Sequence, residues 1–127
     1  MFPRSSGILL HPSSLYGKYG IGTLGNSAIE FIDFLDRSNQ KLWQVFPLGP
    51  TGYGDSPYQC FSAFAGNSYL IDLENLINLG LLETADADKA ELGSDPESID
   101  YGLLYKNKLP LLRKAYENYK KGDNEQM

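Results

Sequence analysis

The stretch GPTGYGDSPYQ, residues 49–59, joins a glycine-rich turn to aromatic, hydroxyl and carboxylate side chains. Gly49, Gly54 and Ser56 have the spacing of the nucleotide-binding loop G-x-x-x-x-G-K-[ST]. Asp55, however, stands where that loop has the lysine that neutralises the β and γ phosphates. A carboxylate at this position reverses the sign of the interaction with phosphate. The residue types therefore argue against nucleotide binding by this loop.

The same loop displays aromatic rings beside small polar groups. Tyr53 and Tyr58 flank residues 54–57, and Phe61 follows closely. A tyrosine ring has an apolar face and a polar tip, which suits the C–H faces and hydroxyl edges of a sugar. Asp55 is either an acceptor for bound hydroxyls or an acceptor for backbone N–H groups that holds the loop. The alternative to sugar binding is that both tyrosines pack the loop against the protein.

A second glycine pattern, GIGTLG, places Gly20, Gly22 and Gly25 at the spacing G-x-G-x-x-G of dinucleotide-binding proteins. That motif directly follows a strand, and here nine residues separate the end of the expected strand from Gly20. The next expected strand also lacks the acidic residue that holds the ribose. We therefore interpret GIGTLG as a flexible turn that leads into a helix.

The remaining residues with chemical potential are isolated. His11 is the only histidine, so the sequence offers neither a histidine metal site nor a Ser-His-Asp set. We expect its ring to be hydrogen-bonded to backbone at the end of a strand. Cys60 is the only cysteine and has no candidate base partner, so we expect it to be buried.

The elements that must position the loop alternate between strand and helix. Residues 8–10 form an apolar run that ends at His11 and Pro12, which predicts a buried strand. Residues 26–39 predict a helix with a capping box at Ser27 and Glu30. Residues 42–48, LWQVFPL, show no clean alternation, which is typical of a strand buried on both faces. The apolar stripe of the expected helix consists of Ala28, Phe31, Ile32 and Leu35.

The second half of the chain predicts helices. Asp72 is the expected N-cap of a short helix that ends before Gly80. Residues 83–98 are polar, and we expect either a loop or a short helix near residues 85–92. In the last element, Pro110 predicts a kink or the start of a fresh helix. The apolar stripe of this element consists of Leu104, Leu111, Leu112, Ala115 and Tyr119.

The order strand, helix, strand, helices predicts an α/β fold. In such folds ligands bind at the carboxyl ends of parallel strands, and residues 49–59 directly follow the second strand. Two parallel strands do not make a stable sheet by themselves. The chain is therefore expected to be the beginning of a larger structure.

Composition narrows the partners. The 127 residues fit one small domain, and the net charge of −5 disfavours nucleic acid and anionic membranes. No apolar run approaches the roughly 20 residues of a membrane span, and no signal peptide is visible. A single cysteine excludes an intrachain disulfide and fits a reducing compartment. We expect a cytoplasmic protein.

Several stretches together closely resemble the N-terminal end of the 4-α-glucanotransferases, also called amylomaltases or disproportionating enzymes. The likeness runs from about Arg4 to Tyr116, and residues 49–59 are its most specific part. The stretches are GILLHPSSL, YGIGTLG, WQVFPLGPTGYGDSPYQ, FSAFAGN, YLIDLENL and DYGLLY. Departures from the family pattern occur at Tyr16, Lys18, Cys60 and Ser68.

The resemblance implies that residues 1–127 are the N-terminal part of one catalytic (β/α)₈ barrel, without a separate second domain. The family transfers part of an α-1,4-glucan to another sugar by a retaining mechanism that needs two carboxylates. These carboxylates are expected downstream of residue 127, so this chain alone should be inactive and should hold no catalytic residue. No cofactor or metal is implied. Self-association through exposed barrel edges is expected of the isolated chain.

The resemblance also assigns roles within the expected substrate-binding set. Ser56 and Tyr58 resemble residues that line the donor glucan subsites, whereas Tyr53 and Tyr105 resemble a pair that forms a second glucan-binding surface. Asp55 is expected to fix the loop. The ligands implied are α-1,4-glucans and maltooligosaccharides. The alternatives from other classes are a free-standing α-glucan-binding module and a nucleotide-binding domain.

Overall fold

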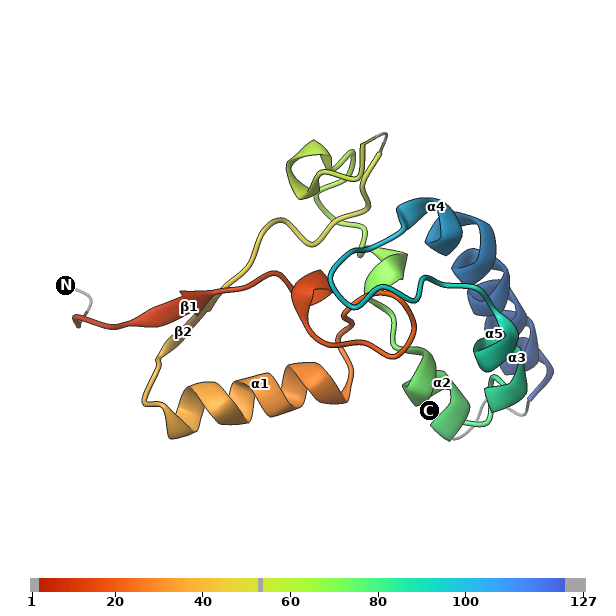
Figure 1. Ribbon diagram of the computed structural model, residues 1–127, viewed down its shortest axis with the longest axis horizontal. Coiled ribbons are helices and arrows are strands. Elements are labelled where there is room, and N and C mark those ends of the chain that lie inside the picture. The colour runs from red at the N-terminus through yellow and green to blue at the C-terminus, as the bar shows by residue number, and fades with distance from the viewer. Residues whose placement is uncertain (1–2, 53, 123–127) are drawn as a thin grey trace. The chain divides into compact units, whose positions relative to one another are not determined.

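A computed structural model describes residues 3–52 and 54–122 (Figure 1). Contacts between residues divide the chain into two compact units. The first unit consists of residues 1–17 and 21–71, and the second consists of residues 18–20 and 72–127. Each unit is described by itself below. The candidate loop belongs to the first unit.

The first unit is built on two parallel strands joined by a helix. Strands β1 (Gly7–Leu9) and β2 (Leu42–Gln44) pair in parallel, with Ile8 opposite Trp43. Parallel strands need a long crossover connection, which here contains helix α1 (Asn26–Arg37). Figure 1 shows α1 running along the strand pair. The predicted strand–helix–strand order is confirmed, although β1 is shifted by one residue and β2 ends four residues earlier than expected.

Helix α1 covers one face of the strand pair through aromatic contacts. The ring of Phe31 meets that of Trp43 edge-on, with 5.0 Å between the ring centroids. Trp43 is fixed in turn because its Nε1–H donates to the carbonyl of Leu10 at 2.7 Å. Ala28 and Leu35 of the predicted stripe are buried, but Ile32 is 51% exposed. The buried face of α1 is therefore narrower than the apolar pattern predicts.

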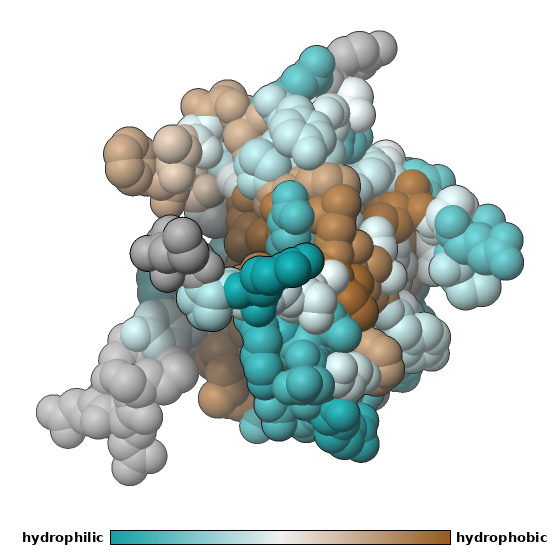
Figure 2. Space-filling view, turned by 90° about the vertical axis from the view of Figure 1, so that its left-hand side faces the viewer, coloured by the Kyte–Doolittle hydropathy of each residue, from teal (hydrophilic) through white to brown (hydrophobic). Residues whose placement is uncertain are grey.

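Only one face of the strand pair is covered in this chain, although the residue pattern is typical of strands buried on both faces. Side chains alternate between the two faces of a strand, and Ile8 and Trp43 occupy the face toward α1. On the opposite face Leu9 is 52% and Leu42 is 58% exposed, because none of the described elements covers them. Figure 2 shows hydrophobic residues, in brown, open to solvent on the face that it displays.

The predicted capping box of α1 is also wrong. The N-cap is Gly25, which has no side chain to accept a hydrogen bond. Ser27 lies inside the first turn, and its hydroxyl donates instead to the carbonyl of Tyr16 at 2.7 Å. Ser27 therefore ties the preceding loop to the helix rather than capping it.

The other short helices of this unit are η1 (Pro12–Ser14), η2 (Pro57–Gln59) and η3 (Ser68–Leu70).

The glycines of GIGTLG are explained by close packing of backbone. Gly20 has φ +76°, and a Cβ built on it would lie 1.8 Å from the carbonyl oxygen of Leu92 within the second unit. A Cβ on Gly22 would lie 2.2 Å from the carbonyl oxygen of Pro12 within the first unit. No side chain fits at such distances. The interpretation of this stretch as a turn is confirmed, but the turn is closely packed rather than open.

The second unit is helical, as predicted. Its elements are α2 (Leu73–Asn78), α3 (Thr84–Lys89), α4 (Tyr101–Leu103), the π-helical segment η4 (Leu104–Lys108) and α5 (Leu109–Lys121). Apolar side chains from these elements and their connections form its core. The buried ones are Leu73, Leu82, Ala87, Leu92, Leu104, Leu111 and Ala115.

The predicted ends of α2 are confirmed. The Asp72 carboxylate accepts a hydrogen bond from the N–H of Asn75 at 2.7 Å, as an N-cap does. Gly80 has φ +70°, and the N–H of Leu81 donates to the carbonyl of Leu76 at 2.9 Å, which completes a glycine C-terminal cap. In the polar segment that follows, α3 confirms the short-helix alternative, with an earlier end than expected.

Pro110 starts a fresh helix, as predicted. It lies in the first turn of α5, directly after the π-helical segment η4. A proline lacks the N–H that would continue the helix, and its ring crowds the carbonyl four residues earlier. The wider turn of a π-helix relieves that conflict without ending the helical path. The same segment carries the candidate residue Tyr105 and the fully buried Lys108.

Candidate functional site

The loop at residues 49–59 is closed at its base by its own backbone. Thr51 and Cys60 form an isolated antiparallel bridge, and the N–H of Asp55 donates to the carbonyl of Gly52 at 3.1 Å. Gly54 has φ +88°, a conformation that glycine adopts without strain. The Sγ of Cys60 donates to the carbonyl of Pro57 at 3.2 Å. Cys60 is half-buried, so the prediction of a buried cysteine is wrong.

Asp55 contributes to this closure through its side chain. Its φ is +52°, in the left-handed region where aspartate is enriched among non-glycine residues. Its Oδ1 accepts a hydrogen bond from the hydroxyl of Thr51 at 3.4 Å. The expected loop-fixing contact is thus present, but the donor is a hydroxyl group rather than a backbone N–H.

Ser56 and Tyr58 extend from the short helix η2. Ser56 is its N-cap residue, and its carbonyl accepts from the N–H of Gln59 at 2.9 Å. Its hydroxyl makes no capping hydrogen bond. The Tyr58 side chain is 72% exposed, so most of its ring is open to a ligand. The alternative that Tyr58 only packs the loop down does not fit this exposure.

Tyr58 is the outer member of a row of three rings. Its ring lies 5.3 Å from that of Phe46, tilted by 47°. Phe46 in turn stacks on His11, with 5.5 Å between centroids and 24° between planes. These separations are typical of favourable aromatic pairs. The row therefore leads from an exposed tyrosine to a histidine that is only 8% exposed.

His11 departs from its predicted environment. Its Nδ1 is buried and has no hydrogen-bond partner among the described residues, so the expected bond from the ring to backbone is not found at this atom. Burial lowers the pKa of the imidazole, because desolvation disfavours the charged form. The ring therefore stacks on Phe46 as a neutral aromatic group.

The structure brings together part of the predicted set. Asp55, Ser56 and Tyr58 lie on one loop of the first unit. Tyr53 lies outside the described residues. Tyr105 belongs to the second unit, where it is 68% exposed on η4. Its predicted pairing with Tyr53 stays a prediction.

Sequence analysis missed the members of the ring row that lie beneath Tyr58. The signal was present in the strand register, because Leu9 pairs with Gln44. Continuing that register by two residues brings His11 opposite Phe46. Phe64 was also missed: its side chain is 100% exposed on the segment that follows the loop, where Phe61 is 74% exposed.

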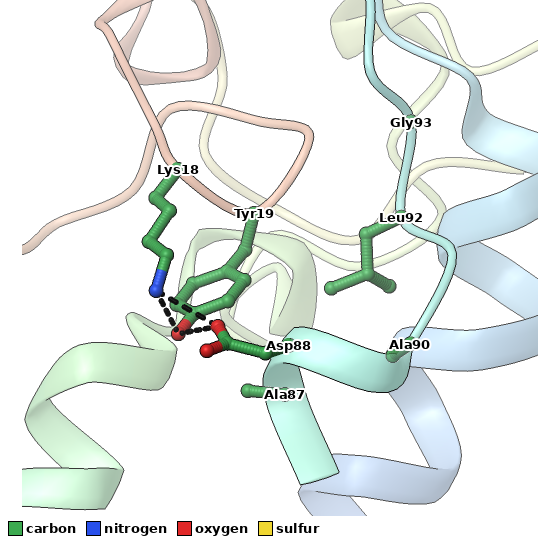
Figure 3. Close-up of a pocket in the computed structure, with 7 residues that line it drawn as sticks. All are labelled: Lys18, Tyr19, Ala87, Asp88, Ala90, Leu92 and Gly93. Carbon is green, nitrogen blue, oxygen red and sulfur yellow. Dashed lines mark hydrogen bonds and ion pairs between the residues drawn. The ribbon is translucent and has the colours of Figure 1, made fainter. Parts of the chain in front are cut away.

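A separate pocket of about 230 Å³ lies in the second unit (Figure 3). Lys18 Nζ lies 2.8 Å from the Asp88 Oδ1, and the Tyr19 hydroxyl donates to the same oxygen at 3.1 Å. The hydrogen bond from Lys18 is the main cause that lowers the pKa of Asp88, whereas burial raises the pKa of Tyr19. Since these polar groups satisfy one another, we interpret them as an internal contact that fastens residues 18–20 to α3. The remaining lining residues are Ala87, Ala90, Leu92 and Gly93.

Neither a metal site nor a membrane span is found among the described residues. No group of three His, Cys, Asp or Glu side chains in residues 3–52 and 54–122 is arranged to hold a metal ion. None of the helices in the same ranges combines the length and the apolar content that crossing a membrane requires. The loop with the ring row is therefore the strongest candidate site.

Comparison with known proteins identifies the class to which this fold and loop belong. The family model described as 4-alpha-glucanotransferase matches residues 10–127. The chain therefore belongs to the 4-alpha-glucanotransferase family. This confirms the resemblance drawn from the sequence.

Individual relatives agree with the family assignment. The 4-alpha-glucanotransferase of Streptococcus pneumoniae serotype 4 is 53% identical over 119 residues, which cover 94% of this chain and 24% of the relative. The Clostridium butyricum enzyme is 55% identical over 116 residues, which cover 91% and 24%. The chain spans about a quarter of the length of the curated relatives it matches.

A solved structure gives the same result for the fold. The amylomaltase from Streptococcus agalactiae, solved in complex with acarbose, superposes with a TM-score of 0.91 at 46% sequence identity. The match covers 96% of this chain and 25% of that one. The arrangement of strands, helices and loops described above is therefore the arrangement found in part of that amylomaltase.

Proposed function

We propose that this chain supplies a glucan-binding loop to an enzyme that transfers a segment of an α-1,4-glucan to a new 4-position of glucose or of another glucan. The observation that carries the proposal is the exposed ring of Tyr58, on the loop that follows a parallel strand. Family membership supports the reaction class. The acarbose complex of the Streptococcus agalactiae amylomaltase supports a glucan-like ligand.

Within this proposal the loop residues divide the work of binding. The face of Tyr58 stacks on a glucose ring of the donor, and the hydroxyl of Ser56 meets a sugar hydroxyl. Asp55 holds the loop through Thr51. Tyr53 and Tyr105 form a second surface that binds longer glucans at a distance from the reacting bond.

The catalytic groups are proposed to lie in a part of the enzyme outside this chain. A retaining mechanism needs two carboxylates about 5 Å apart across the reacting bond. Asp55 is the only acidic residue on the candidate loop, and its carboxylate already accepts from Thr51. The chain is proposed to be the N-terminal part of a single (β/α)₈ catalytic barrel, to which both units belong. We assign it no cofactor or metal.

Glucan binding by the chain tests the proposal directly. Titration of the isotope-labelled protein with maltoheptaose should shift the NMR signals of the loop, including those of Ser56 and Tyr58. Cellohexaose, which has β-1,4 linkages, is the matched control ligand and should cause much smaller shifts. Equal responses to the two sugars, or shifts confined to the second unit outside Tyr105, would contradict the proposal.

The proposed larger barrel also implies that the isolated chain associates with itself. Leu9 and Leu42 are exposed on one face of the β1–β2 pair, and unpaired strand edges favour pairing with another chain. Light scattering at micromolar concentration should give a mass above that of one chain. A monomer with a sharp cooperative melt would overturn this expectation.

The proposed setting follows from composition. An acidic chain with one cysteine fits the cytoplasm, and its net charge of −5 does not favour nucleic acid or anionic membranes as partners. Fractionation of cells that express the natural protein, with detection by antibody, tests the location. Recovery of the protein outside the cytoplasmic fraction would contradict it.

A further inference from the structure

His11 and Phe46 form a pair at the carboxyl end of the parallel strands. His11 lies two residues after the end of β1, and Phe46 lies two residues after the end of β2. The ladder continues beyond the strands, since the N–H of Leu10 donates to the carbonyl of Gln44 at 3.0 Å. The pair is therefore attached to the sheet.

The backbone around His11 is fixed from several sides. Trp43 Nε1 donates to the carbonyl of Leu10, and the N–H of Ser14 donates to the carbonyl of His11 at 2.9 Å. Pro12, the next residue, is fully buried and restricts the backbone further. With the ring itself only 8% exposed, the imidazole occupies one defined position.

Tyr58 lacks comparable support of its own. It belongs to a short 3-10 helix on a loop, and its side chain is 72% exposed. Among the described residues, the ring of Phe46 is the aromatic group that lies against Tyr58, and the next ring beneath Phe46 is that of His11. The orientation of the exposed ring is therefore set by a row that ends on the sheet.

From this arrangement we propose that His11 is a positioning residue, which holds the Tyr58 ring through Phe46 in the orientation that accepts a glucose ring. The inference rests on the proposed glucan-binding function of Tyr58. The flat imidazole ring suits the stack with Phe46, with 5.5 Å between centroids and 24° between planes.

Substitution at His11 tests the row. His11→Ala removes the inner ring, and His11→Phe restores a ring of similar shape without the nitrogens. In His11→Ala the NMR shifts of the Tyr58 ring protons should move toward values for an unstacked tyrosine. The affinity for maltoheptaose should fall roughly three- to tenfold, which is the range expected for the loss of one aromatic pair. His11→Phe should return the Tyr58 ring shifts to near those of the starting protein. It should also bring the affinity back to within about twofold.

A second variant keeps the inference testable if His11→Ala does not fold. Phe46→Leu cuts the row at its middle and leaves His11 in place, and it should alter the Tyr58 shifts and the affinity in the same way. Unchanged Tyr58 shifts in a folded His11→Ala or Phe46→Leu protein would overturn the positioning role. The Tyr58 shifts are read without sugar, so they remain decisive even if the starting protein binds no glucan. Failure of the starting protein to bind glucan would contradict the proposed function alone.

Discussion

Tyr58 and Tyr19 are two tyrosines near carboxylates that are used in opposite ways. Tyr58 is 72% exposed and follows Asp55 on an open loop, whereas Tyr19 is 8% exposed and donates its hydroxyl hydrogen bond to Asp88. The polar groups around Tyr19 already bond to one another, since Lys18 donates both to Asp88 and to the Tyr19 hydroxyl. An aromatic ring beside an acid is therefore not sufficient for a binding site. Exposure of the ring separates the two tyrosines, since both carboxylates already accept a hydrogen bond from a neighbouring side chain.

The largest expected effect concerns chemistry. The purified chain should convert no maltotriose into glucose and longer oligomers, because the two carboxylates of a retaining mechanism are proposed to lie outside this chain. Product analysis by chromatography after long incubation provides the measurement. Turnover well above a protein-free blank would mean that one of the two regions is catalytic after all.

The stability of the second unit should depend on pH because the unit buries a lysine. Lys108 is fully buried, and burial lowers its pKa to about 8 although Asp72 acts in the opposite direction. Because the unfolded lysine keeps its proton up to about pH 10.5, stability should rise as pH increases from 8 to 10.5, and Lys108 should make no pH-dependent contribution below about pH 8, where it is protonated in both states. The upper value of this gain is roughly 3 kcal/mol.

Urea unfolding at both pH values measures that gain. Lys108→Met keeps the length of the side chain without the charge. The free energy of unfolding of this variant should therefore lack the rise between pH 8 and 10.5. The exposed Lys106 offers a matched control, since Lys106→Met should leave the dependence in place. Parallel profiles for Lys108→Met and the starting protein would show that Lys108 is not the titrating group.

The comparison of the two tyrosines predicts different outcomes in the complete transferase. Tyr58→Ala should lower kcat/KM for maltooligosaccharide donors by about five- to tenfold, because a stacking contact worth about 1 kcal/mol or more is lost. Tyr19→Phe removes only a hydroxyl from an internal contact and should leave kcat/KM nearly unchanged. Steady-state kinetics with maltotriose distinguishes the two. Similar losses of kcat/KM in both variants would show that Tyr58 and Tyr19 do not differ in their contribution to substrate use.

Chain length should separate the loop from the proposed second surface. Tyr53→Ala in the complete enzyme should spare maltotriose and weaken binding to amylose, since Tyr53 is assigned to the remote surface. Tyr58→Ala should instead affect both substrates. Affinity electrophoresis on amylose, together with maltotriose kinetics, provides the two readouts. Identical behaviour of the two variants would remove the division of roles.

The smallest expected effect belongs to the contact between Lys18 and Asp88. Both side chains are about half exposed, and exposed ion pairs contribute little and are screened by salt. Asp88→Asn should lower the melting temperature slightly at low salt and less at high salt. The contribution of the pair is also lost as pH falls through the lowered pKa of Asp88. A large loss that salt does not reduce would indicate that the cluster does more than fasten residues 18–20.

Features governed by neighbouring residues were predictable from the sequence. Asp72 and Gly80 mark the ends of α2, and Pro110 starts α5, because each acts through backbone geometry within one turn. The capping role of Ser27 failed because Gly25 began the helix two residues earlier. The residue pattern of the strands is suited to burial on both faces, but the local pattern does not encode which elements cover a face, and one face is exposed here.

For the candidate site, the types of residue in the loop indicated a sugar ligand, which stays a prediction, and the structure adds that Tyr58 is exposed. The rings beneath it were not found, because the pairing of His11 with Phe46 depends on the register of strands separated by a helix. A lone histidine was therefore interpreted by itself, although its position is defined by a residue 35 places away.

The packed glycines at positions 20 and 22 have a consequence for reading mutational data. Any side chain at Gly20 would overlap the carbonyl of Leu92, and any side chain at Gly22 would overlap the carbonyl of Pro12. In a scan that scores every substitution by survival of activity, both positions should be as intolerant as ligand contacts. Their resemblance to a dinucleotide fingerprint would strengthen that false impression. Sensitivity to alanine and serine alike, without any change in ligand affinity for the fraction that folds, would mark them as sites of steric exclusion.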